Sequence, residues 1–360
     1  MRVYNFNPGP ATLPLSVLEK AQKDFVDFKG KGLSIMEMSH RSPEYDEVHN
    51  QAIKNIKQIL SIPENYHVLL LQGGASTQFY HIPYNFLTRD SEADYVNTGS
   101  WSKKAIKEAK IFGKVNVAAS SEDTNFSRIP KQSEMKFSPN AKYVHITSNN
   151  TIFGTQYHSF PDTKGVTLMV DMSSDIISRK FDVTEFQLIY AGAQKNMGPS
   201  GVTVVIISDE MAKKVKPDVP TMVNYNTHIE KNSLFNTPPT FGIYMLKLVT
   251  DWVVELGGIE KIEDINNSKA KTLYDAMDKN PEFFKGTTEI ESRSKMNVTM
   301  RLPSEELEKM FIDSAKNEGM IGLKGHRSVG GIRASLYNAF PLEGVNKLTS
   351  FMADFIAKNG

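Results

Sequence analysis

The amino-acid sequence predicts an α/β fold, with a large domain built on a mostly parallel sheet and a smaller α+β domain after it. Two observations carry this prediction. Over the first two thirds of the chain, short apolar runs alternate with stretches of helical periodicity, which is typical of a parallel sheet covered by helices on both faces. Beyond about residue 262 the alternation gives way to a different order of helices and strands. We therefore expect a large domain at 16–262 and a small domain made of 1–15 and 263–360.

The elements of the large domain follow from the spacing of apolar residues. That spacing predicts one helix from Ser16 to Phe28 and another from Ser42 onward, where a serine cap and Pro43 in the first turn favour helix initiation. Between later loops the expected strands are 68–71, 143–147, 167–170, 188–191 and 202–207, with a helix at 102–112 between the first two.

A long amphipathic helix over 241–256 is expected to lead out of the large domain, because it ends at the pair Gly257-Gly258. The small domain then contains a strand at 297–301, a helix at 304–318, a strand at 331–336 and a terminal helix. No internal repeat of about 20 to 50 residues is visible, which excludes solenoids and propellers.

The composition is that of a folded protein without a strong overall charge. Hydrophobic residues make up 40% and charged residues 23% of the 360 residues, which excludes disordered and collagen-like classes. Lys and Arg number 42 against 41 Asp and Glu, so any anion site has to be local. No apolar run approaches the ~20 residues that cross a bilayer, and no apolar stretch precedes the first prolines. We expect a cytoplasmic protein that binds neither nucleic acid nor membrane.

The sequence contains no cysteine. This excludes disulfides, thiolate zinc sites, iron–sulfur clusters and every mechanism with a cysteine nucleophile. The eight histidines show no HExxH and no other compact ligand spacing, so no catalytic metal is expected.

The segment LLLQGGASTQF predicts an anion-binding turn. An apolar strand runs into Gly73-Gly74, and Ala75, Ser76 and Thr77 open a helix whose N-terminus attracts negative charge. The segment matches neither GxxxxGK[ST] nor GxGxxG, so an ATP P-loop or a dinucleotide fingerprint is not supported. The alternative is a tight turn in which glycine serves geometry alone.

Two residues at the ends of successive predicted strands point to pyridoxal phosphate chemistry. Asp171 ends one strand in TLMVDMSSD, and Lys195 follows the next in LIYAGAQKNMGPSG. Both should reach the carboxyl edge of the sheet, where ligands bind in α/β folds. Pyridoxal phosphate needs a lysine that forms an imine with its aldehyde and a carboxylate against its ring nitrogen, because a protonated pyridine is the better electron sink. The alternatives are a surface lysine and an acid that caps a helix.

Two further loop residues have side chains that suit the same cofactor. Trp101, in VNTGSWSKKAIKEA, follows a strand and precedes a helix, so its indole can stack on a planar ring and shield it from water. Thr151, in SNNTIFGT, can offer a hydroxyl to a cofactor oxygen. Core packing is the alternative for the tryptophan, and a local bond to backbone is the alternative for the threonine.

The tripeptide His-Arg-Ser occurs twice, at His40-Arg41-Ser42 and at His326-Arg327-Ser328, and the second copy is followed by Arg333 in a glycine-rich stretch. Arginine and histidine in such loops suit the bidentate capture of a carboxylate or phosphate. Surface salt bridges are the alternative for each copy.

These segments, taken in order along nearly the whole chain, resemble the phosphoserine aminotransferase family, pyridoxal phosphate enzymes of the aspartate aminotransferase fold type. The segments that carry the resemblance are NFNPGPATLP, SHRSPEY, GGASTQF, NTGSW, SNNTIFGTQ, VDMSSD, YAGAQKNMGPSG, NTPPTFGIY and GHRSVGGIRASLYNA. The resemblance implies fold type I of the pyridoxal phosphate-dependent transferases and a homodimer with active sites at the subunit interface. Glutamate would convert the cofactor to its pyridoxamine form, which then aminates 3-phosphohydroxypyruvate to O-phosphoserine in serine biosynthesis.

The resemblance also assigns roles to individual residues. Lys195 would hold the cofactor covalently and shuttle the proton, Asp171 would pair with the pyridine nitrogen, and Trp101 would stack on the ring. The other cofactor contacts would come from Ala75, Ser76, Thr151 and Gln194, with Asn236 and Thr237 reaching the cofactor phosphate of the neighbouring subunit. The substrate anions would be bound by His40, Arg41, His326, Arg327 and Arg333, with Arg333 on the carboxylate.

One departure bears on the substrate. Many family members carry arginine where this chain has Ser76, so the phosphate of the substrate is expected to meet one fewer guanidinium. Some members also act on 3-hydroxy-2-oxo-4-phosphooxybutanoate in pyridoxine biosynthesis. Within the same fold type, the missing cysteine excludes a cysteine desulfurase. A transaminase of alanine or serine that acts on glyoxylate stays open, as does a non-catalytic α/β binding protein.

Overall fold

The computed structural model describes residues 2–360 and is built around a seven-stranded sheet. The strand order is β2-β10-β9-β8-β5-β3-β4, and only β10 runs antiparallel to its neighbours. The sheet is therefore mostly parallel, as predicted. Its strands are β2 (Tyr66–Gln72), β3 (Glu92–Asn97), β4 (Lys114–Ser120), β5 (Val144–Thr147), β8 (Leu168–Asp171), β9 (Leu188–Gly192) and β10 (Val202–Ser208).

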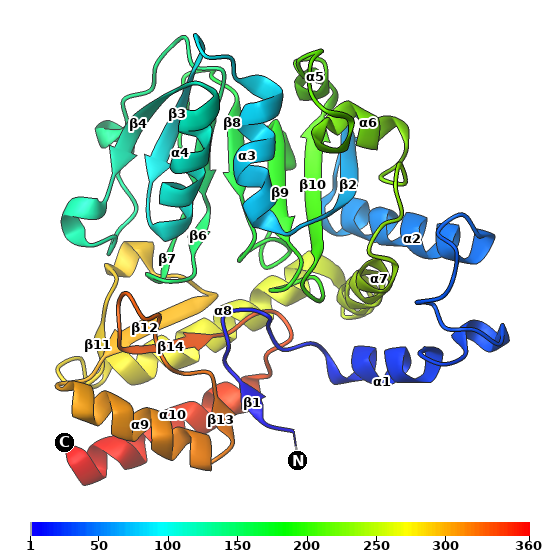
Figure 1. Ribbon diagram of the computed structural model, residues 1–360. Helices are drawn as coiled ribbons and strands as arrows, with labels where there is room; N and C mark the ends of the chain where they lie inside the picture. Colours follow the sequence, from blue (N-terminus) through cyan, green and yellow to red (C-terminus); the bar gives the residue numbers. More distant parts are fainter. Residues whose placement is uncertain (1) are drawn as a thin grey trace.

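Helices cover both faces of this sheet (Figure 1). One face packs against α3 (Ala75–Phe86) and α4 (Ser100–Phe112), with the short α5 (Asp209–Ala212) and α6 (Tyr225–Glu230) beside them. On the other side lie α2 (Pro43–Leu60) and α7 (Thr240–Glu255), which pack closely against each other. The N-terminal helix α1 (Leu15–Asp24) contacts α7 at the rim of the molecule.

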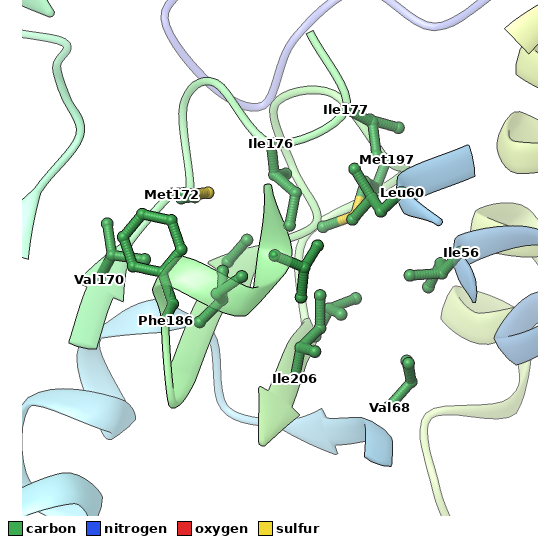
Figure 2. Packing of buried hydrophobic residues seen from close by; sticks show 14 of the residues in the cluster. Ile56, Leu60, Val68, Val170, Met172, Ile176, Ile177, Phe186, Met197 and Ile206 are labelled. Atoms are coloured by element: carbon green, nitrogen blue, oxygen red, sulfur yellow. The ribbon is translucent and has the colours of Figure 1, made fainter. Parts of the chain in front are cut away.

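Buried apolar side chains on the α2 side of the sheet also support the loops at its carboxyl edge. Figure 2 shows Val68, Val170 and Ile206 of three strands in one cluster with side chains of α2. The same cluster contains residues of the loops that follow β8 and β9, namely Met172, Ile176, Ile177 and Met197. Ile176 and Met197 are completely buried. The loop that follows Asp171 and the loop that contains Lys195 are therefore anchored in the core rather than free at the surface.

A three-stranded antiparallel sheet lies below the large sheet in Figure 1, and a second hydrophobic cluster packs around it. Its strands are β11 (Lys285–Gly286), β12 (Asn297–Arg301) and β14 (Ile332–Ser335), and its helices are α8 (Gly258–Asp278), α9 (Glu305–Asn317) and α10 (Leu342–Asn359). The N-terminal strand β1 (Tyr4–Asn5) pairs with β13 (Met320–Ile321), and Phe6 packs against Phe340 with ring centres 4.3 Å apart. The first residues of the chain therefore join its C-terminal part. A hairpin of β6 (Asn149–Asn150) and β7 (Thr155–Gln156) lies between the two larger sheets.

Most predicted elements occur within two residues of their expected positions. The five expected strands are β2, β5, β8, β9 and β10, and Ser42 accepts a hydrogen bond from the Tyr45 N–H at the start of α2, as a capping serine does. The first helix was predicted too long, since α1 ends at Asp24 and leaves Phe25 and Val26 exposed by 46% and 77%. No helix within residues 2–360 is both long enough and apolar enough to cross a membrane.

Candidate active site

The carboxyl ends of the parallel strands converge on a cavity of about 540 Å³. Gln72 ends β2, Thr147 ends β5 and Asp171 ends β8, and the loops that leave these strands form much of the cavity wall. Because β10 is antiparallel, its N-terminal side reaches the same edge and contributes Ser200 and Gly201. The N-terminal segment closes the cavity with Pro8 and Gly9. The topology therefore makes a single site from distant parts of the sequence.

Nine of the predicted site residues line this cavity. They are Ala75, Ser76, Trp101, Thr151, Asp171, Gln194, Lys195, His326 and Arg333. Five others do not line it, namely His40, Arg41, Asn236, Thr237 and Arg327. The chain thus brings together the residues expected around the cofactor ring and leaves outside most of those expected to reach an anion.

Asp171 and Lys195 are electrostatically coupled inside the cavity. Burial raises the pKa of Asp171, while the positive charge of Lys195 and a hydrogen bond from the Ser173 N–H at 2.9 Å oppose this rise. Burial also lowers the pKa of Lys195, and the charges of Asp171 and Asp175 oppose that change. An amine with a lowered pKa is more readily available as a neutral nucleophile. When Lys195 is protonated, its positive charge favours the ionised form of Asp171.

Trp101 lies between a lysine of the cavity and a lysine of its own helix. Its ring centre is 5.8 Å from Lys195 Nζ and 4.4 Å from Lys104 Nζ. The indole Nε1–H donates a hydrogen bond of 2.9 Å to the hydroxyl of Thr151, and Arg333 donates one of 3.1 Å to the backbone carbonyl of Thr151. Thr151 therefore fixes the orientation of an aromatic ring and a guanidinium at once.

The N-terminus of α3 faces the same cavity through Gly73, Gly74, Ala75 and Ser76. Gly73 has a φ of +104°, and a Cβ at this position would lie 2.5 Å from Cγ2 of Thr77. Glycine is thus required for the close approach of the turn to the helix. The helix has 12 residues and no acidic residue in its first turn, so its free N–H groups and its dipole favour an anion at this end.

The residues present fit pyridoxal phosphate. The Thr147 hydroxyl and the Gln194 side-chain carbonyl oxygen are buried without a partner, and both residues line the cavity. Unpaired buried polar atoms are costly unless a ligand satisfies them. The cavity also offers an amine, a carboxylate, an aromatic face and a helix N-terminus, which match the aldehyde, the ring nitrogen, the ring and the phosphate of the cofactor.

The five residues outside the cavity have different surroundings. Arg41, Arg327 and Thr237 are exposed, and Asn236 donates a hydrogen bond of 3.1 Å to the Gln72 side chain beside a second, smaller cavity of about 190 Å³. Within the described part of the chain, no carboxylate forms an ion pair with any arginine of the two His-Arg-Ser regions, that is, Arg41, Arg327 and Arg333. The salt-bridge alternative for these arginines therefore has no support among residues 2–360.

Sequence reasoning missed several residues of the cavity wall. Thr147 ends a strand that was predicted, so its place at the carboxyl edge could have been read from the sequence. Ser173 and Ser174 lie two and three residues after Asp171 and offered the same signal. Pro8 and Gly9 could not be placed, because their position depends on the pairing of β1 with a strand over 300 residues away. Residues 2–360 contain no group of three or more His, Cys, Asp or Glu side chains that could hold a metal ion.

Comparison with known proteins gives consistent relatives over the full chain. The family model described as aminotransferase class-V matches residues 3–348. A phosphoserine aminotransferase of Herpetosiphon aurantiacus is 56% identical over 360 residues and covers 100% of both chains. The solved structure of phosphoserine aminotransferase from Bacillus circulans subsp. alkalophilus has a TM-score of 0.97 at 53% identity, covering 100% of this chain and 99% of that one. A phosphoserine aminotransferase from Trichomonas vaginalis, solved with bound pyridoxal phosphate, has a TM-score of 0.93 at 37% identity, covering 98% of this chain and 100% of that one.

Proposed function

The chain belongs to the aminotransferase class-V family, and we propose that it catalyses the phosphoserine aminotransferase reaction. In this reaction the amino group of L-glutamate passes to 3-phosphohydroxypyruvate, which gives O-phospho-L-serine and 2-oxoglutarate in serine biosynthesis. The fold is fold type I of the pyridoxal phosphate-dependent transferases, and the cofactor is pyridoxal 5'-phosphate. The observation that carries the proposal is the convergence of Lys195, Asp171, Trp101 and Arg333 on one cavity.

Four features of this chain hold the cofactor. When bound, pyridoxal phosphate supplies an electron sink for bond cleavage at the substrate α-carbon. Lys195 would bind it through Nζ and carry the proton to and from the α-carbon, for which a lowered pKa suits it. Asp171 would hold a proton on the pyridine nitrogen, and Trp101 would cover the ring and exclude water. The N-terminus of α3, with Ala75 and Ser76, binds the phosphate.

Arginine and histidine side chains would hold the substrate, some from the cavity of this chain and some from the partner subunit. Arg333 is buried, with 5% of its surface exposed, and its Nε has no partner, so it is available for the carboxylate that glutamate and the keto acid have in common. The phosphate of the substrate would be bound by His326 and Arg327 together with His40 and Arg41. Ser76 supplies no charge where many relatives have arginine. The four side chains named above would therefore have to neutralise both negative charges of the phosphate.

A second copy of the chain would complete the site. His40, Arg41, Asn236 and Thr237 do not line the cavity of their own chain, which supports a homodimer in which they reach the site of the partner. Two large apolar side chains close to these residues in the sequence are exposed, Met36 before His40 and Phe235 before Asn236. Exposed apolar side chains of this kind would be buried in a subunit interface.

The remaining parts of the proposal concern domain organisation and location. The division into 16–262 and 1–15 with 263–360 is supported by two separate hydrophobic clusters, one around each larger sheet. A cytoplasmic location is supported by a composition without a strong charge or a long apolar run. The same anion-binding side chains would also suit 3-hydroxy-2-oxo-4-phosphooxybutanoate, the phosphorylated keto acid of pyridoxine biosynthesis, because it too carries a carboxylate and a phosphate.

Single half-reactions with different amino donors test the substrate assignment. The holoenzyme is mixed with L-glutamate, O-phospho-L-serine, L-serine or L-alanine, and the cofactor absorbance is followed. We expect O-phospho-L-serine and L-glutamate to convert the cofactor, and L-serine and L-alanine to react far more slowly, because only a donor with a second anionic group, a phosphate or a side-chain carboxylate, uses both anion sites. Faster conversion with L-alanine or L-serine than with O-phospho-L-serine would replace the proposal with a transaminase of alanine or serine.

A further inference from the structure

A buried polar pair lies directly behind the cavity acid. Tyr190 on β9 and His145 on β5 are 0% and 1% exposed, and the Tyr190 hydroxyl lies 3.0 Å from His145 Nε2. Neither side chain lines the cavity. Nothing in the proposed reaction uses these two residues, yet burying a phenol and an imidazole together is costly unless they are paired.

The sheet register brings this pair to Asp171. Strand β8 lies between β5 and β9, where Asp171 is opposite Tyr190 and Met169 is opposite His145. These residues share one face of the sheet, because residues two apart on a strand point to the same side. Burial raises the pKa of Tyr190, and the charge of Asp171 and a hydrogen bond to it act in the same direction. The phenol therefore keeps its proton and donates it towards the carboxylate.

The unpaired nitrogen of His145 fixes the direction of the other bond. Burial lowers the pKa of His145 to about 3, so the imidazole is neutral and carries one N–H. Its Nδ1 is buried with no partner. Of the two ring nitrogens, the unprotonated acceptor costs less to bury without a partner than an N–H, because a buried N–H needs an acceptor in place of water. The proton is thus on Nε2, which donates to the Tyr190 oxygen.

We propose that His145 and Tyr190 are positioning residues that keep Asp171 ionised through two hydrogen bonds in series. One runs from His145 Nε2–H to the Tyr190 oxygen and the other from the Tyr190 O–H to the carboxylate, and together we call them the relay. These two hydrogen bonds offset the loss of water around Asp171 without adding another charge beside it. A donor that is itself polarised by a second donor binds an anion more strongly. This inference rests on the proposed function only in that pyridoxal phosphate binds with its ring nitrogen against Asp171.

The ring nitrogen of the bound cofactor reports on this chain of bonds. One proton is held between that nitrogen and Asp171, and every donor to the carboxylate keeps the proton on the nitrogen. Without the Tyr190 hydroxyl the carboxylate becomes more basic, so the proton moves towards Asp171 and the pyridine becomes more nearly neutral. Both half-reactions should then slow by about 10- to 100-fold, the effect of losing a hydrogen bond to a charged group.

The test loads the wild-type protein and its variants with pyridoxal phosphate that carries ¹⁵N in the ring, and measures the ¹⁵N chemical shift at neutral pH. In Tyr190→Phe we expect the shift to move from the value of protonated pyridine towards that of neutral pyridine. His145→Leu should move it in the same direction by a smaller amount, and His145→Gln, which keeps an N–H donor, should restore the wild-type value.

Tyr95→Phe is the matched control. Tyr95 is 1% exposed, its ring stacks on His145 with centres 4.9 Å apart, and its hydroxyl is bonded to Tyr143 at 2.9 Å instead of to the relay. The Tyr95→Phe variant loses an equally buried hydroxyl but should leave the ¹⁵N shift unchanged. If Tyr190→Phe does not fold, His145→Leu against His145→Gln decides the matter.

An unchanged shift in Tyr190→Phe and in His145→Leu overturns the relay. An equal movement in Tyr95→Phe does so too, because it would reflect a general disturbance of the core. The readout needs only bound cofactor, so failure of the relay can be told from failure of the proposed function. A moved shift in a protein that does not convert O-phospho-L-serine would support the relay and contradict the substrate.

Discussion

Arg333 shows how a single side chain can serve two different ligands. It extends from β14 into the cavity and donates a hydrogen bond of 3.1 Å to the carbonyl of Thr151. Burial lowers its pKa without removing its charge. Since glutamate and the phosphorylated keto acid both present a carboxylate next to the reacting carbon, the guanidinium can hold either one in the same pose.

We therefore expect Arg333→Ala to lower kcat/KM of both half-reactions by about 10- to 100-fold, the cost of losing a charge-assisted hydrogen bond. Stopped-flow absorbance with glutamate and with O-phospho-L-serine measures the two losses separately. Arg301→Ala is the control, because Arg301 lies on the neighbouring strand β12 but is paired with Glu308. A loss confined to one half-reaction contradicts the assignment of Arg333 to the common carboxylate.

For single residues, the sequence reveals a role where the residue ends a predicted strand or closely follows one. Asp171 and Lys195 were predicted from the strands before them, and both line the cavity. Tyr190 could not be recognised in the same way, because its partner atoms come from β5 and β8 and are fixed only by the register of the sheet. A polar residue inside an apolar run carries no signal of which strand will lie beside it.

Among the elements, the junction between β2 and α3 depends most closely on residue type. Gly73 has a φ of +104°, and the space that a Cβ would fill is taken by Thr77, whose hydroxyl donates a hydrogen bond of 2.7 Å to the Gly74 carbonyl. The first turn of α3 is thus held against the turn that precedes it. A Cβ at position 73 would force the Thr77 side chain or the turn itself to shift.

Gly73→Ala should weaken the binding of pyridoxal phosphate by about tenfold or more, since backbone strain of this kind costs on the order of 1–3 kcal/mol. Equilibrium dialysis of the cofactor measures the change. Gly165→Ala is matched, because Gly165 also has a positive φ of +87° but nothing within 4 Å of its Cβ position. Equal weakening in both variants would show that strain anywhere in the fold is sufficient, and the role of the junction would be lost.

The elements that were predicted well are those whose pattern is local. Buried strands such as β9 and β10 form continuous apolar runs, and α2 carries its own capping serine. Strand β4 was missed because it lies at the edge of the sheet, where its residues alternate irregularly between buried and exposed. Helix α1 was predicted too long because Phe25 and Val26 continue its apolar spacing although they are exposed in the single chain.

At the scale of the whole molecule, the proposed site needs two copies of the chain. Residues 40, 41, 236 and 237 lie outside the cavity of their own chain, so in the proposed homodimer a subunit that lacks Lys195 would still supply Arg41 to its partner. Mixing the inactive variants Lys195→Ala and Arg41→Ala should then restore activity. Random exchange makes half of the dimers mixed, and each mixed dimer has one complete site, which gives about a quarter of the wild-type rate.

The mixture is assayed after mild dissociation and reassembly, with each variant alone treated in the same way. A mixture no more active than the sum of its parts contradicts the sharing of sites between subunits. Dimerisation itself is checked separately by light scattering, so that a monomer and a dimer with independent sites are told apart.

Reduction of the holoenzyme with borohydride identifies the lysine that holds the cofactor. The reduced protein is digested and analysed by mass spectrometry. We expect a phosphopyridoxyl group on Lys195 alone, and none at that peptide in Lys195→Ala. Attachment to a different lysine, or a protein that takes up no cofactor at all, would disprove the role of Lys195 and with it the proposed function.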